Sequence, residues 1–146
     1  MNLFSSMDIS ATGLTAERVR MDVVSQNIAN ANTTRTVQGG PYRRKLVVFK
    51  EIQPDSFQSI LEKVKGKYTG KGVEVVQIIE DEQTPLRRVY DPGHPDADQQ
   101  GYVSYPNVNI VAEMVDMISA TRAYEANVTA FNAAKSMFQK SLEIGK

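Results

Sequence analysis

The last third of the chain carries an apolar residue at every seventh position, and this repeat constrains the fold more than any other feature. The series consists of Ile110, Met117, Tyr124, Phe131 and Phe138. A companion series four positions later consists of Met114, Thr121, Val128 and Leu142, with Lys135 interrupting it once. Two apolar positions in every seven residues are typical of a helix that packs like a coiled coil. We therefore predict a long helix from Val108 to about Leu142 that needs other helices as partners.

The first turns of this predicted helix are apolar over a wider face, because Val111, Val115 and Ile118 lie beside the repeat. Asn109 precedes them and is suited to cap the helix. A helix of about 33 residues spans roughly 50 Å at 1.5 Å per residue, which exceeds the roughly 13 Å radius of gyration of a 100-residue domain. We expect the helix to project beyond any core that the middle of the chain can build, and an apolar flank left uncovered would mark an interface.

A second, narrower repeat begins the chain and predicts another helix. Its apolar positions are Met7, Leu14, Met21 and Ile28, with Val24 and Ala31 three positions after the last two. The spacing favours a helix from Leu3 to about Ala31 with a thin apolar seam. Gly13 weakens such a helix by roughly 1 kcal/mol relative to alanine. Because the two helices bracket a strand-rich segment, we expect them to return antiparallel to each other within one chain.

The N-terminal helix ends in the segment NIANANT, which places asparagines at Asn27, Asn30 and Asn32. Asparagine is a mediocre helix former because its side chain competes for backbone hydrogen bonds. The C-terminal repeat carries Asn127 and Asn132 as well. A buried asparagine can set the register and partner number of packed helices at a cost in stability. We therefore predict asparagines at helix contacts, and the sequence leaves open whether the partner is the same chain or a neighbour.

The middle of the chain changes character and predicts a small amount of β-structure. The β-branched segments YRRKLVVFKEI, GVEVVQIIED and LRRVY are candidate strands. SFQSILEKVK, between the first two, has helical spacing. The following proline-rich segment DPGHPDADQQGYVSYPNV is expected to be extended and docked. We thus divide the chain into an N-terminal helix (1–32), a β-rich middle segment (33–107) and a C-terminal helix (108–146). The predicted fold is mainly α, with the two long helices pairing as an antiparallel coiled coil and a β-hairpin-like insertion between them.

Composition disfavours several classes of function. The 146 residues carry 17 acidic and 17 basic side chains, and this balance argues against a nucleic-acid partner. No apolar run approaches the roughly 18 residues that span a bilayer, so no membrane insertion is expected. The N-terminus lacks the basic and apolar regions of a cleaved secretory signal. With no cysteine and one histidine, a Cys/His or Ser/His nucleophile pair is nearly excluded, and no catalytic residue or cofactor is expected.

One alternative from a different class rests on His94, which lies near Asp91, Asp96 and Asp98. An imidazole and carboxylates are ligands that a metal-dependent hydrolase could use. The spacing across two prolines matches no particular metal motif, so a solvated turn is the favoured interpretation and no metal site is predicted.

Two segments resemble a known family. DISATGLTAERVRMDVVSQNIANANT, followed by glycines and YRR, is similar to the N-terminal signature of flagellar rod, hook and hook-associated axial proteins. The segment from VYDPGHPDADQQGYVSYPNV to the C-terminus resembles the proximal rod members of that family. The stretch from about Gln53 to Val73 departs from the family pattern.

The resemblance implies a non-enzymatic rod subunit of the flagellar basal body that transmits motor torque across the periplasm. It implies export by the flagellar type III apparatus without a cleaved signal, and contacts with other rod subunits and the ring-to-rod adaptor. Alternatives are another rod or hook-type axial subunit, or a soluble coiled-coil adaptor or export chaperone. The predicted subunit-interface residues are Met7, Leu14, Met21, Val24, Asn27, Ile28, Asn30, Met114, Met117, Ile118, Tyr124, Asn127, Val128, Phe131 and Phe138.

Overall fold

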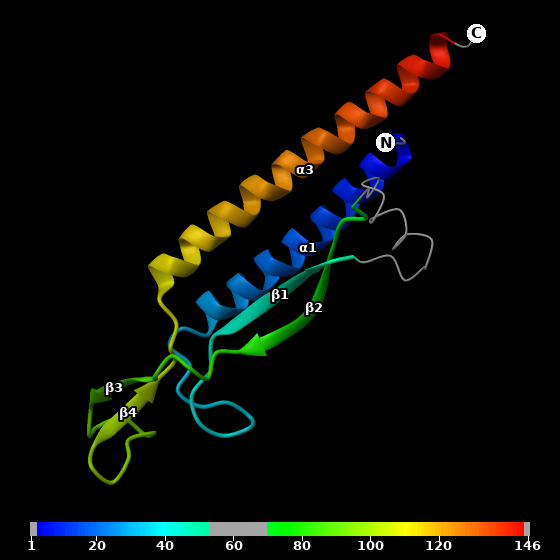
Figure 1. Ribbon diagram of the computed structural model, residues 1–146. Coiled ribbons are helices and arrows are strands. Elements are labelled where there is room, and N and C mark those ends of the chain that lie inside the picture. Colours follow the sequence, from blue (N-terminus) through cyan, green and yellow to red (C-terminus); the bar gives the residue numbers. More distant parts are fainter. Residues whose placement is uncertain (1–2, 53–69, 145–146) are drawn as a thin grey trace, which may run out of the picture.

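The computed structural model describes residues 3–52 and 70–144 (Figure 1). These residues form two long helices and four short strands. In chain order the elements are α1 (Leu3–Ala29), β1 (Lys45–Glu51), β2 (Val73–Glu80), β3 (Arg87–Tyr90), β4 (Tyr102–Tyr105) and α3 (Ile110–Ile144). The prediction of a mainly helical chain with a small β part is confirmed, and both helices begin and end within about two residues of their predicted bounds.

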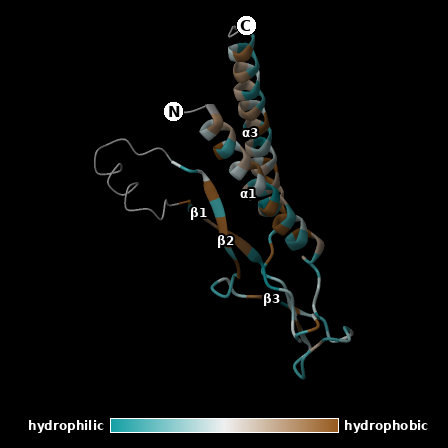
Figure 2. Cartoon of the chain, turned by 90° about the vertical axis from the view of Figure 1, so that its right-hand side faces the viewer, coloured by the Kyte–Doolittle hydropathy of each residue, from teal (hydrophilic) through white to brown (hydrophobic). Residues whose placement is uncertain are grey.

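The two helices pack antiparallel along their lengths, and α3 extends past the N-terminal end of α1 (Figure 1). At that end the rings of Phe4 and Phe138 meet edge to face with centroids 5.0 Å apart. At the other end the amide of Asn27 donates a hydrogen bond to Glu113. The β1–β2 hairpin lies on the opposite side of α1, and among the described elements its two strands pack on that helix (Figures 1 and 2). The described part of the chain therefore has three layers, with α1 between α3 and the hairpin.

Strands β1 and β2 pair antiparallel, from Lys45 opposite Glu80 to Glu51 opposite Val73. The register shifts between Val48 and Phe49, which is the signature of a β-bulge. The hairpin is fastened to α1 where the backbone N–H of Val73 donates to the Thr12 hydroxyl at 3.2 Å. This arrangement covers a face of α1 that the apolar repeat alone does not reveal.

A second two-stranded sheet, β3–β4, lies beyond the helix pair at the opposite end of the molecule from both termini (Figure 1). Its pairing runs from Arg87 opposite Tyr105 to Tyr90 opposite Tyr102, and Val103 is fully buried. Gly101 adopts a φ of 78°, and a Cβ there would lie 2.9 Å from the Tyr90 ring, so only glycine suits this turn. The prediction of an extended proline-rich segment is confirmed only for its second half, where Tyr102–Tyr105 is a paired strand. Residues 91–101 instead form a series of turns closed by backbone hydrogen bonds such as that from the Gly101 N–H to the Asp98 carbonyl.

The interior is built from small and polar side chains. The buried apolar residues of the described part include four alanines and three valines, and the largest fully buried side chains are Glu113, Val103 and Asn27. A predicted helix in the segment SFQSILEKVK lies outside the described residues. Neither of the two described helices contains an apolar stretch long enough to cross a membrane.

Candidate functional site

Asn27 lies where α1, β1 and α3 meet, and it is 1% exposed. Its amide nitrogen donates to the Lys45 carbonyl and to Glu113 Oε2, both at 2.9 Å. Its amide oxygen accepts from the Lys45 N–H and from the Tyr42 hydroxyl, also at 2.9 Å. All the hydrogen-bonding capacity of the carboxamide is therefore used inside the subunit. The asparagine lies at a helix contact, as predicted, and its partners are in its own chain.

Glu113 of α3 is also 1% exposed, and its carboxylate is compensated from both sides. Oε1 accepts a 2.6 Å hydrogen bond from Arg44 Nε, while Oε2 accepts from Asn27. A buried carboxylate is costly unless it is paired and hydrogen-bonded in this way. Burial raises the pKa of the Tyr42 phenol, and the Glu80 and Glu113 carboxylates raise it further. Glu113 on α3 thus connects the helix pair to Arg44, the residue that precedes β1.

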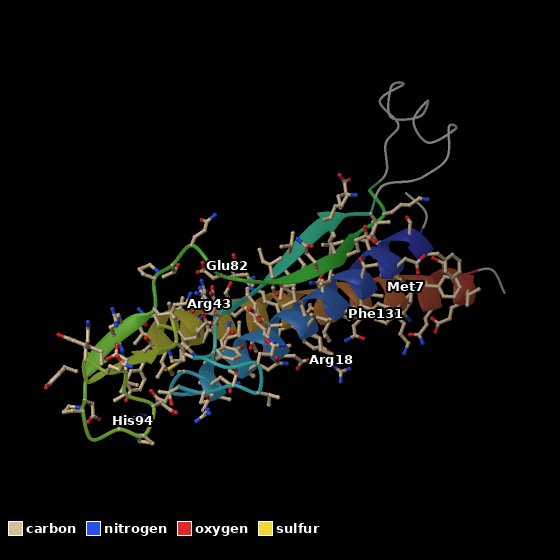
Figure 3. The ribbon with its side chains drawn as sticks, turned by 90° about the horizontal axis from the view of Figure 1, so that it is seen from below. Met7, Arg18, Arg43, Glu82, His94 and Phe131 are labelled. Atoms are coloured by element: carbon tan, nitrogen blue, oxygen red, sulfur yellow. The ribbon has the colours of Figure 1, made fainter. Side chains whose placement is uncertain are left out.

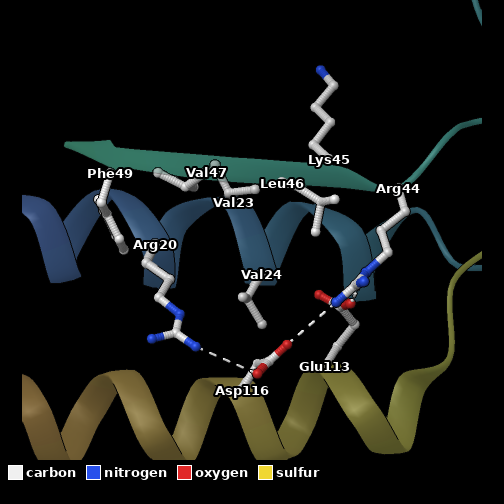
Figure 4. Close-up of a pocket in the computed structure, with 10 residues that line it drawn as sticks. All are labelled: Arg20, Val23, Val24, Arg44, Lys45, Leu46, Val47, Phe49, Glu113 and Asp116. Carbon is white, nitrogen blue, oxygen red and sulfur yellow. Dashed lines mark hydrogen bonds and ion pairs between the residues drawn. The ribbon is translucent and has the colours of Figure 1, made fainter. Parts of the chain in front are cut away.

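A cavity of about 300 Å³ opens beside this cluster between the three layers (Figure 4). Both Arg20 and Arg44 extend a guanidinium toward Asp116, with N–O distances of 3.4 and 3.3 Å. Val23 and Phe49 form part of the apolar wall. Because both arginines pair with Asp116, the charges of the cavity serve to join α1, β1 and α3.

Two further asparagines position α3 relative to the strands. Asn109 caps the helix as predicted, since its side-chain oxygen accepts from the N–H groups of Val111 and Ala112. Asn107 accepts from the Arg44 N–H and donates to the carbonyl of Asp81. Sequence reasoning missed Asn107, because its partners are backbone groups far away in the chain.

The predicted interface residues of α1 are mostly half-buried within the subunit. Met7, Leu14, Met21 and Ile28 are of intermediate exposure, and Val24 is buried. Asn30 is engaged locally, donating to the Gln26 carbonyl and accepting from the Thr33 hydroxyl. These two hydrogen bonds lie at the C-terminal end of α1. Within the asparagine run, Asn27 therefore makes a contact between helices, whereas Asn30 stabilises the end of α1.

The predicted interface residues of α3 fall on two different faces. Met117, Tyr124, Asn127, Val128, Phe131 and Phe138 are half-buried, whereas Met114 and Ile118 are exposed. The second series facing α1 is not the predicted companion series. It consists of Glu113, Ala120, Asn127 and Ala134, three of them buried. The companion assignment is only partly correct: the Thr121 hydroxyl donates to the Met21 sulfur of α1 and Val128 is half-buried, whereas Met114 and Leu142 are exposed. The buried positions are filled by small and polar residues, which give no apolar signal.

Gly13 is the residue that lets the helices approach at this second series. A Cβ on Gly13 would lie 2.9 Å from the Asn127 amide nitrogen, closer than a real contact allows. The Asn127 amide in turn donates to the Ala123 carbonyl of its own helix. The glycine that weakens α1 thus makes room for an asparagine on α3, and its position opposite Asn127 could not be read from local sequence.

The apolar flank at the start of α3 is uncovered. Val111 and Val115 are 71% and 61% exposed, and Ile118 is 54% exposed. A helix turns about 100° per residue, so these three residues point away from the side that holds Glu113 and Met117. The flank therefore lies on the outer surface of the three layers. The expectation of an uncovered apolar flank is met.

His94 lies in the loop between β3 and β4, at the end of the molecule opposite Met7 and Phe131 (Figure 3). Its Nδ1 accepts from the backbone N–H of Asp96, and its ring faces that of Tyr105. Asp96 is engaged by Thr34 and Arg35, which fastens the loop to the segment after α1. Among residues 3–52 and 70–144, no cluster of three or more potential metal ligands is present.

Asp81 and Asp98 organise the turns beside the strands. Hydrogen bonds from the hydroxyl and N–H of Thr84 lower the pKa of Asp81. The N–H of Tyr102 donates to Asp98 at 2.9 Å and lowers the pKa of that carboxyl. Both carboxylates accept hydrogen bonds from neighbouring backbone N–H groups, so their role is to shape the loops.

Comparisons with known proteins match both ends of the chain. A family model described as flagella basal body rod protein matches residues 7–35, and one described as flagellar basal body rod FlgEFG protein C-terminal matches residues 99–144.

Full-length similarity extends across the middle segment as well. The chain is 52% identical over 152 residues to the flagellar basal-body rod protein FlgC of Bacillus subtilis, covering 100% of both chains. It is 49% identical to the FlgC protein of Borreliella burgdorferi, covering 99% of this chain and 98% of the relative. The FlgC protein of Escherichia coli O157:H7 is 42% identical, again over the whole of both chains.

Proposed function

Because the chain belongs to the FlgC family of flagellar basal-body rod proteins, we propose that it polymerises through its terminal helices to form the proximal part of the drive shaft. It is a structural subunit of the rod in the bacterial flagellar basal body, where it assembles with other basal-body components. The finer part of the proposal is that the subunits build a periplasm-crossing shaft that transmits torque. In that shaft the antiparallel helices of each subunit pair as a coiled coil.

The observation that carries this proposal is the uncovered apolar flank of α3. Val111, Val115 and Ile118 are each more than half exposed, on the face of α3 opposite α1. A contiguous exposed apolar patch is the usual mark of a protein–protein contact. In a family of rod subunits, the occupant is a neighbouring subunit, and the contact must repeat along the assembly.

The predicted interface residues then divide into two groups with different tasks. Met114 and Ile118 belong to the contact with a neighbour, since they lie on or beside the exposed flank. The half-buried residues that line the α1–α3 contact, such as Phe131 and Tyr124, hold the helix pair in the geometry that presents the flank. Asn27 fixes the register between that pair and the hairpin through its four hydrogen bonds.

The partners are proposed from the same family relationship. They are other rod subunits, the ring-to-rod adaptor, and the flagellar type III apparatus that exports the chain. Export of an unfolded chain is supported by the interior of the described residues, where most buried side chains are small and hydrophobic burial therefore contributes less to the stability of the fold.

A charged substitution on the flank tests the proposal. We expect Val115→Asp to fold normally, because the side chain is exposed, yet to be absent from isolated basal bodies and to abolish swimming. Circular dichroism of the purified variant reports the fold, and immunoblots of basal bodies report incorporation. Ser25→Asp, on the exposed polar side of α1, is the matched control and should swim. A fully motile Val115→Asp strain would overturn the assignment of the flank.

A further inference from the structure

The subunit has a second exposed apolar face, on the outer side of the β1–β2 hairpin. β2 carries two exposed apolar residues there, Val76 at the bulge and Ile78, with the exposed side chains of Glu74 and Glu80 on either side of them along the strand. Val76 and Ile78 are 52% and 49% exposed, whereas Val73 and Val75 are less exposed. Figure 2 shows the hydrophobic colouring of these strands on the side of the molecule away from α3.

The two exposed faces lie on the two outer layers of the subunit. The α3 flank is on one side of α1 and the outer face of the hairpin is on the other (Figures 1 and 4). Resting on the proposed function, we infer that the outer hairpin face of one subunit packs on the α3 flank of a second copy of this chain. The layer order α3, α1, hairpin then repeats from one copy to the next.

The inner face of the hairpin supplies a precedent for this contact. It already packs on a helix, because β1 and β2 both lie against α1. The inferred contact places the outer face of the same sheet on another helix, so that the hairpin is covered on both sides. A two-stranded sheet on its own is marginally stable, and a second covering helix would add apolar burial to it.

The charges and the lengths of the α3 flank and of strand β2 are compatible with this contact. Arg122 follows Ile118 by one turn on the outer stripe of α3, and it forms no ion pair with any residue of the described chain. Glu74 and Glu80 are both exposed and bracket the apolar pair along β2, so a glutamate lies near either end of that pair as a partner for Arg122. The stripe from Val111 to Arg122 spans about 16 Å, and the strand from Glu74 to Glu80 spans about 20 Å.

The symmetry of this contact suits a growing assembly. A flank that packed on the same flank of a second copy would form a closed dimer with two-fold symmetry. A contact between two different faces is heterologous, and each added copy presents a fresh flank to the next one. Such a contact closes a ring or extends a helical filament, according to the rotation between copies.

Disulfide cross-linking tests the inference directly, because the chain contains no cysteine. Two single variants, Val115→Cys and Ile78→Cys, are co-expressed in one strain, and its basal bodies are isolated and oxidised. We expect a cross-linked dimer from the mixture and monomer from basal bodies of either variant alone. Co-expression of Val115→Cys with Ser25→Cys is the matched control and should leave the chains monomeric.

The outcomes separate the inference from the proposed function. A dimer from Val115→Cys alone would show that the flank packs on itself and would overturn the inference. Monomer in every mixture, with both variants present in basal bodies, would also overturn it and would leave the rod function intact. Absence of the unmodified chain from basal bodies would instead contradict the proposed function.

Charge reversal gives an independent measurement of the same contact. We expect Arg122→Glu to reduce the amount of subunit in basal bodies several-fold, and a second substitution, Glu74→Arg or Glu80→Arg, to restore it. The glutamate whose reversal rescues assembly identifies the direction of the strand across the helix. Failure of both double variants to recover more subunit than Arg122→Glu alone would overturn the pairing of these faces.

Discussion

The Asn27 side chain pairs with the backbone of Lys45 as a neighbouring strand would, donating to its carbonyl and accepting from its N–H, each at 2.9 Å. One carboxamide on helix α1 thereby satisfies both backbone hydrogen-bonding groups of the first residue of strand β1. The remaining two hydrogen bonds of Asn27 reach Tyr42 and Glu113, so a single side chain connects three segments of the chain. This geometry explains why an asparagine occupies a buried helix position for which leucine would have a better propensity.

Replacing Asn27 should therefore be severely destabilising. Asn27→Leu leaves the Lys45 backbone, the Tyr42 hydroxyl and the Glu113 carboxylate with fewer partners in a buried site. We expect a loss of about 3–5 kcal/mol in the free energy of unfolding, as for breaking a buried polar network. Urea denaturation followed by circular dichroism measures it. Asn30→Ala, which removes only two bonds at the helix end, should cost about 1 kcal/mol, and an equal loss in both variants would contradict the distinction.

Gly13 and Asn127 should show strong coupling in a double-mutant cycle. Gly13→Ala gains helix propensity of about 1 kcal/mol, but its methyl group meets the Asn127 amide at 2.9 Å. We expect Gly13→Ala to lower the thermal midpoint in the native background and to raise it in an Asn127→Ala background. Additive effects of the two substitutions would show that the helices do not approach closely at Gly13.

Tyr42 should make the subunit sensitive to alkaline pH. Its pKa is raised in the folded chain by burial and by the Glu80 and Glu113 carboxylates. The folded state therefore holds the phenol proton more tightly than the unfolded state does. The resulting stability is fully present below about pH 10, the ordinary pKa of tyrosine, and is lost as the pH rises through the raised value.

Tyr42→Phe should abolish that part of the pH dependence. Urea midpoints measured from pH 8 to pH 11 are expected to fall more steeply for the native chain than for the variant. Below pH 9 the variant should be less stable by about 1 kcal/mol, because it lacks the hydrogen bond to Asn27. Parallel curves for the two proteins at alkaline pH would contradict the role of the phenol.

A charge at Phe131 should act on the fold, unlike a charge at Val115. Phe131 is half-buried in the helix pair, so Phe131→Asp is expected to reduce the thermal midpoint of the purified subunit and to abolish swimming as a consequence. Native-like thermal unfolding of Phe131→Asp together with lost motility would place this residue at the contact with a neighbour instead.

Much of this architecture could be predicted from periodicity. The seven-residue series through Met117, Tyr124, Phe131 and Phe138 marks the inward side of α3, and the wider apolar start marks its exposed flank. Asn109 was identifiable as a helix cap because its side chain acts on the next three residues. These signals are local, and each follows from the geometry of one helix.

The rest depends on contacts between distant segments. Ala120 and Ala134 occupy buried positions of α3 that are too small to register as an apolar repeat, and Asn127 is accommodated by a glycine more than 100 residues earlier in the chain. The pairing of Arg44 with Glu113 joins an arginine and an acid whose sequence contexts look like exposed surface. The apolar periodicity of a helix shows that one of its faces will be buried. It does not show which segment of the chain will cover that face.

The prevalence of small and polar side chains in the interior also governs how the subunit responds to temperature. The heat-capacity change of unfolding grows with the apolar area exposed and falls with the polar area exposed. With Glu113 and Asn27 among its largest fully buried side chains, the isolated subunit should have a low heat-capacity change for its size. Its stability curve is then shallow, so its free energy of unfolding should change little over a wide range of temperature.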